Sequence, residues 1–68
     1  MAAYHFAIHD NGGGFEDLGG MILLDDATAF AFARGIILDL MRGVNKSYSS
    51  WTMDITEGKR AVGSVPFK

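Results

Sequence analysis

The sequence contains no cysteine, a single proline and no run of basic residues among its 68 positions. The lack of cysteine excludes disulfide bonds and thiolate zinc sites, and it fits a reducing compartment, so we expect a cytoplasmic protein. Eight acidic and six basic residues give a formal net charge of −2. Because nucleic-acid binders concentrate positive charge on one face, this balance argues against nucleic acid as a partner.

Signals for membrane insertion or secretion are also lacking. Residues 1–5 do not form the basic start and apolar run of a signal peptide. The most hydrophobic stretch, residues 21–41, is long enough to span a bilayer but contains three aspartates and Arg34. A charge at the bilayer centre costs roughly 2.5–3.5 kcal/mol on insertion scales. We therefore expect a soluble protein without a membrane partner.

The length and hydrophobicity of the chain predict one small folded unit. An apolar fraction of 49% is typical of a folded domain. We expect residues 1–68 to form a single domain. A domain of this size buries only about 60% of the surface that its unfolded chain exposes, so its stability margin is narrow. Such domains often add a partner subunit or a metal to widen that margin.

Alternating apolar and polar residues predict strands with one buried face. The expected strands are residues 4–9, residues 15–18 continuing into 21–24, residues 51–56 and residues 60–67. Gly19 and Gly20 are expected to break or bulge the second strand, and residues 57–59 form a hairpin turn before the last one. Pro66 donates no hydrogen bond to a ladder, so the last strand should end on an edge of the sheet.

A helix is expected between the second and third strands, from Asp26 to Arg42. Asp25 or Asp26 provides an N-cap, Arg42 suits the negative end of the helix dipole, and Gly43 is placed to end the helix. The element order is therefore strand-strand-helix-strand-strand. This order predicts an α+β fold in which one helix covers one face of a four-stranded antiparallel sheet, and residues 45–50 provide a polar connection.

The two sides of this helix differ less than expected for an isolated domain. The apolar stripe that should cover the sheet consists of Ala29, Ala33, Ile36, Ile37 and Leu40, with Phe30 and Phe32 on its flanks. The opposite side also carries apolar residues, and Gly35 lies in the helix interior, where glycine costs about 1 kcal/mol relative to alanine. Exposed apolar residues are common, so this glycine is either merely tolerated or allows another helix to approach closely.

We expect this outer helix face to bind a partner, either as a homodimer or with a larger protein. The candidate partner-binding residues are Ala31, Arg34, Gly35, Leu38 and Met41. The leading functional hypothesis is therefore a non-enzymatic protein-interaction or regulatory module. It requires no cofactor.

The alternative hypothesis is a small ligand-binding or hydrolytic domain that uses the polar face of the sheet. His5 and His9 share a strand face but lie about 13 Å apart at 3.3 Å per residue, so they cannot chelate one metal ion by themselves. If the first and third expected strands pair, Asp54 shares that face and can orient one histidine as a general base. A solvated sheet face that holds two histidines is the ordinary explanation, so no catalytic or metal-binding residue is assigned.

Other motifs do not support specific chemistry. The glycines at 12–14 lead into Phe15, Glu16 and Asp17, whereas a phosphate loop needs lysine and a hydroxyl at the start of a helix. The acidic residues show no EF-hand spacing. No serine has a histidine base at a recognisable spacing.

Several short segments of the sequence together form a familiar pattern. They are residues 4–10 (YHFAIHD), 17–20 (DLGG), 24–25 (LD), 51–55 (WTMDI), 58–59 (GK) and 65–67 (VPF). The chain resembles a family of small uncharacterised proteins of rhizobia and related alphaproteobacteria. The resemblance implies the same strand-helix order in a bacterial cytoplasm, and it provides no activity and no catalytic residues to carry over. Family members tend to have a more charged outer helix face, and the element order is also loosely similar to that of HicB-type antitoxin domains.

Overall fold

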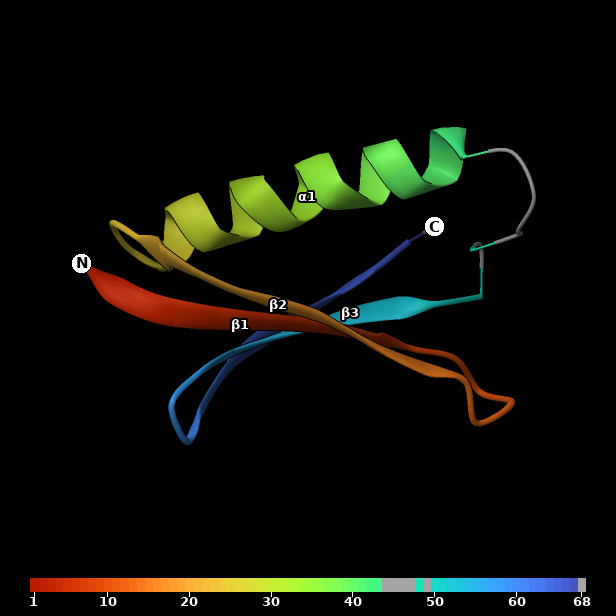
Figure 1. Cartoon of the computed structure of the whole chain (residues 1–68), viewed down its shortest axis with the longest axis horizontal. Helices are drawn as coiled ribbons and strands as arrows, with labels where there is room; N and C mark the ends of the chain where they lie inside the picture. The colour runs from red at the N-terminus through yellow and green to blue at the C-terminus, as the bar shows by residue number, and fades with distance from the viewer. Residues whose placement is uncertain (44–47, 49, 68) are drawn as a thin grey trace.

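The computed structural model describes residues 1–43, 48 and 50–67. Its elements are β1 (Ala2–His9), β2 (Phe15–Leu23), α1 (Asp26–Arg42), β3 (Thr52–Glu57) and β4 (Arg60–Pro66). The strands form one antiparallel sheet in the order β2-β1-β3-β4, and α1 lies along one face of it (Figure 1). The predicted α+β class and element order are confirmed.

The core lies between α1 and the two central strands. Phe6 stands opposite Ile55 and Ile8 opposite Met53 in the β1–β3 pairing, and these four side chains are almost completely buried. Because side chains alternate across a strand, the residues between them face the other side of the sheet, which no described helix or strand covers (Figure 1). We call that side the open sheet face. It carries His5 and His9, as the alternation predicts.

Two bulges change which side chains reach which face. In β2, Phe6 pairs with Gly19 and Ala7 with Asp17, so Leu18 is an extra residue, and Gly19 adopts a φ of 93°. This bulge confirms the expected irregularity at Gly19. In β4, Ile55 pairs with Gly63 and Thr56 with Ala61, so the chain again contains one extra residue.

The ends of α1 are set by Asp25 and Gly43. The Asp25 carboxylate accepts hydrogen bonds from the Thr28 backbone N–H and hydroxyl, both at 2.8 Å, which completes the N-cap. The Gly43 N–H donates to the Leu40 carbonyl at 3.0 Å. Gly43 has a φ of −61°, so it ends the helix by turning into an extended conformation without using the left-handed region.

The apolar stripe of α1 packs on the sheet as predicted. Ala29, Ala33 and Ile37 are buried, and Ile36 and Leu40 are partly buried against the same core. The small alanines allow the helix to lie close to the strands. No helix in the described part of the chain is long and apolar enough to cross a membrane.

A second group of aromatic rings closes the end of the sheet near residue 48. The ring of Tyr48 lies 5.5 Å from that of Trp51 and 5.6 Å from that of Phe67, and all three residues pack with the core. The burial of Tyr48 was not predicted, because it falls in the segment expected to be a polar connection. Most of that connection, residues 44–47 and 49, lies outside the described residues. Pro66 belongs to β4, an edge strand, as predicted.

Candidate functional site

The outer face of α1 is the side that points away from the sheet. Leu38 is 63% exposed there, and Ala31, Arg34 and Gly35 are exposed as well. Apart from the nearby backbone of α1 itself, a Cβ atom built on Gly35 would meet no atom of the described residues within 4 Å. The packing of this chain therefore does not require a glycine at position 35, although glycine weakens a helix interior.

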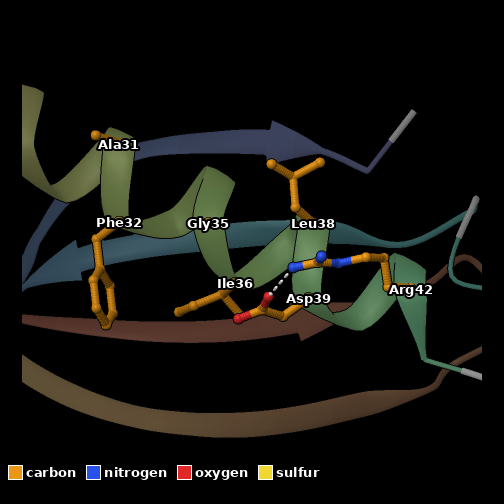
Figure 2. A pocket seen from close by; sticks show the side chains of 7 residues that line it. All are labelled: Ala31, Phe32, Gly35, Ile36, Leu38, Asp39 and Arg42. Atoms are coloured by element: carbon orange, nitrogen blue, oxygen red, sulfur yellow. Dashed lines mark hydrogen bonds and ion pairs between the residues drawn. The ribbon is translucent and has the colours of Figure 1, made fainter.

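An open groove of about 530 Å³ runs along this face. Its lining residues are Ala31, Phe32, Gly35, Ile36, Leu38, Asp39 and Arg42. Figure 2 shows Phe32 and Ile36 extending on one side of Gly35 and Leu38 projecting on the other. Because Gly35 has no side chain, the helix backbone at this position forms the floor of the groove. Apolar side chains form its walls. We call this surface the Gly35 groove.

Three charged residues surround the Gly35 groove. The Arg42 guanidinium donates to the Asp39 carboxylate at 3.0 Å along the helix. Arg34 lies on the other flank, where it borders a smaller cavity of about 260 Å³ together with Leu38 and the end of β4. Within the described residues, Arg34 forms no ion pair with a carboxylate.

The sequence-predicted partner-binding residues are divided between these two hollows. Ala31, Gly35 and Leu38 line the Gly35 groove, Arg34 lines the smaller cavity, and Met41 is exposed beyond both. Sequence reasoning missed the participation of Phe32, Ile36, Asp39 and Arg42. Helical periodicity assigns Ile36 to the apolar stripe and Phe32 to its flank. Both are partly buried, so each contributes to the core and to the groove wall.

The open sheet face holds two separate histidine–carboxylate pairs. His9 Nε2 lies 3.1 Å from Asp54 Oδ2, and the Ser64 hydroxyl donates to Asp54 Oδ1 at 2.8 Å. His5 Nε2 lies 2.7 Å from Asp17 Oδ1 on the neighbouring strand. The structure therefore places His9 beside Asp54, as the pairing of β1 with β3 implies, but it gives His5 a different partner.

The order of groups in the first pair limits its chemistry. The Asp54 carboxylate lies between His9 and Ser64, whereas nucleophilic catalysis by serine needs a histidine between the hydroxyl and the carboxylate. Ser64 is therefore not activated as a nucleophile, although His9 oriented by Asp54 has the arrangement of a general base. Among the described residues, no group of three or more His, Asp or Glu side chains could hold a metal ion.

A third polar cluster ties the start of α1 to the sheet. Asp26 accepts a hydrogen bond from the Tyr4 hydroxyl at 2.7 Å and a bidentate pair from Arg60 at 2.8 and 3.0 Å. Arg60 also donates to Glu57. The hydrogen bonds from Arg60 and Tyr4 lower the Asp26 pKa to about 2. The contacts with Asp26 and Glu57 raise the pKa of Arg60 above its usual value, so this residue remains charged.

Hydrogen bonds also shift the pKa values of two further titratable groups at the start of α1 and next to it. The hydrogen bond to Asp26 raises the Tyr4 pKa to about 12, since the ionised phenol would lose its proton donation and face a carboxylate. Hydrogen bonds from Thr28 lower the pKa of the Asp25 carboxyl. Every polar group of the cluster has a partner within the chain, so we assign it a structural role.

A family model described as a domain of unknown function, DUF6894, matches residues 3–68. The chain belongs to this family. No curated protein and no solved structure matches it.

Membership in the DUF6894 family accounts for nearly the whole chain and confirms part of the resemblance seen in the sequence. The family description carries no activity, so the function must be argued from the surfaces of this DUF6894 domain. Both candidate surfaces, the Gly35 groove and the open sheet face, lie within the matched residues.

Proposed function

We propose that this domain is a non-enzymatic protein-interaction module that associates through the outer face of α1. The observation that carries the proposal is Gly35. It weakens the helix and no contact within the described chain requires it, but it opens a groove with apolar walls on the surface. A close approach by a partner is the use that explains the glycine.

The narrow stability margin of a small domain supports the same proposal. A domain of this size buries only about 60% of the surface of its unfolded chain. Leu38 at the groove and Met41 beyond it remain exposed. Covering these side chains would remove apolar surface from water and stabilise the folded state by mass action. A cytoplasmic, bacterial setting remains a prediction that rests on the lack of cysteine and on the resemblance.

The proposal is tested by the apparent size of the tagged chain, both purified and in lysate of its native host. We expect a species larger than the 7.4 kDa monomer in at least one of the two conditions. The double variant Gly35→Glu/Leu38→Glu should return the chain to monomer size, because two carboxylates would occupy the groove.

The matched control is Phe15→Glu/Ile22→Glu. These side chains are 67% and 64% exposed on the open sheet face, so the control makes the same charge change away from α1. It should leave the larger species intact, and circular dichroism should show that both variants stay folded. Monomer size in both conditions would overturn the proposal, as would loss of the larger species only in the control.

The second candidate function is ligand binding or hydrolysis at the open sheet face. The contact between His9 and Asp54 favours it, because that pair has the arrangement of an oriented general base. The test uses the ester p-nitrophenyl acetate as the probe. Hydrolysis should be slower with His9→Gln and Asp54→Asn than with the wild type, whereas His5→Gln should have no effect. Equal rates in all four proteins would overturn this candidate.

A further inference from the structure

The occupant of the Gly35 groove can be inferred from the shape and charge of α1 itself. The groove lies directly beside a projecting side chain, Leu38, which is 63% exposed. Ala31 and Gly35, four residues apart, allow another helix backbone to come close, while Leu38 offers apolar surface one turn further on. A surface with a hollow and a projection side by side is suited to packing against a second copy of itself.

The outer face has the positions of a short coiled-coil seam. Thr28, Ala31, Gly35, Leu38 and Arg42 follow the alternating three- and four-residue spacing of the seam positions. Arg34 and Asp39 then occupy the two flanking positions. They are about 140° apart around the helix at 100° per residue, so they lie on opposite flanks and do not pair within one helix.

Charge complementarity decides the direction of the second helix. In a parallel helix pair, a flanking residue of one chain faces the residue five positions further along in the other, and such pairs set orientation. Arg34 and Asp39 are five positions apart, so each Arg34 would face the Asp39 of the other copy. In an antiparallel pair, like flanks meet, and the two Arg34 residues would lie near each other.

The ion pairs already present leave this contact available. Arg34 forms no ion pair with a carboxylate in the described part of the chain. Asp39 accepts from Arg42 through Oδ1, and a carboxylate has acceptor sites for further donors. The second Arg34 would therefore add to the existing pair without displacing it.

We infer that two copies of this chain associate through α1, side by side and parallel about a two-fold axis, with Gly35 against Gly35 and two Arg34–Asp39 contacts between copies. The inference rests on the proposed function and names its partner. The two sheets would then lie on the outside of the dimer. One 17-residue helix contributes a small interface, so the dimer should be weak and form at micromolar or higher concentration.

Introduced cysteines test the direction of the helices, because the native chain has none. Under mild oxidation, Ala31→Cys and Leu38→Cys should each form a disulfide-linked dimer, since a parallel two-fold pair places each position opposite itself. Ala61→Cys, exposed on the β4 hairpin, serves as the control for random collision and should not cross-link. Cross-linking only between the Ala31→Cys and Leu38→Cys proteins when they are mixed would show an antiparallel pair and overturn the inference.

Charge reversal tests the contact between copies. By sedimentation equilibrium, Arg34→Asp and Asp39→Arg alone should each weaken self-association by about tenfold, because both symmetric contacts become repulsive. A mixture of the two variants should regain wild-type association. In the mixed dimer the two substituted positions carry opposite charges and face each other, while the native Arg34 and Asp39 form the second contact. Failure of the mixture to recover would overturn the inference.

A partner other than a second copy would give a different result from the lack of any partner. If the purified chain remains monomeric and uncross-linked while lysate contains a larger species sensitive to Gly35→Glu/Leu38→Glu, the second copy is not the partner and this inference is overturned. The proposed function would then stand. If the chain is monomeric both when purified and in lysate, this inference and the proposed function are both overturned.

Discussion

The ring of Phe30 on α1 lies directly over Gly63 of β4. A Cβ atom built on Gly63 would be 2.5 Å from Phe30 Cζ and 3.1 Å from Cε1, closer than side chains pack. The helix therefore contacts this edge of the sheet through the Phe30 ring, which packs directly against the backbone of Gly63. Glycine at position 63 is required by this contact, in contrast to glycine at position 35.

Gly63→Ala should destabilise the fold. Extra methyl groups in a packed region cost about 1–3 kcal/mol, and the Phe30 ring must shift to accommodate this one. The effect should appear as a lower urea midpoint with an unchanged m-value. Gly12→Ala is the control, because its nearest atom would be Asp10 Oδ1 at 3.6 Å, an ordinary contact. Combining Gly63→Ala with Phe30→Leu should recover part of the loss, and a purely additive double variant would contradict the contact.

Gly35→Ala should have the opposite effect on the isolated monomer. The added methyl group meets nothing within the described chain, and alanine favours a helix interior over glycine by about 1 kcal/mol. The urea midpoint measured at high dilution should therefore rise. The same variant should weaken self-association, since the methyl group enters the groove floor. A lower midpoint at high dilution would show that the fold itself needs Gly35.

Local patterns in the sequence predicted the elements well. The helix Asp26–Arg42 and an N-cap at Asp25 or Asp26 follow from periodicity and cap chemistry. The structure has the same helix bounds, with Asp25 as the cap. The alternation in β1 placed His9 on the open face, and antiparallel pairing then brought it to Asp54. These features depend on residues close in sequence or on one simple pairing.

The features that were missed depend on tertiary register. A bulge in β4 turns Arg60 to the helix side of the sheet, where it reaches Asp26. Simple alternation would put Arg60 on the same face as Ser64. The bulge in β2 likewise brings Asp17 to His5. A one-residue insertion reverses the faces of every following side chain, and its exact position is not encoded in local periodicity.

Acid should destabilise the protein partly through Asp26. Its pKa is lowered to about 2 by Arg60 and Tyr4, whereas the carboxyl in an unfolded chain titrates near 3.8. Since the folded pKa is the lower one, the stabilisation is present above about pH 4 and is lost as the pH falls toward 2. Urea midpoints measured across this window should fall more steeply for the wild type than for Asp26→Asn. Asp39→Asn should keep the steep fall, and parallel curves for the wild type and Asp26→Asn would contradict the assignment.

Alkali should act through Tyr4. Its pKa is raised from 10.0 to about 12 by the hydrogen bond to Asp26, so the folded state favours the neutral phenol. With the folded pKa above the unfolded one, this stabilisation is present below pH 10 and is lost as the pH rises toward 12. Absorbance of tyrosinate should therefore show a late step in the wild type that is missing in Tyr4→Phe. In Asp26→Asn the step should move to lower pH, because a neutral amide does not repel the phenolate, and an unmoved step would assign the late titration to another cause.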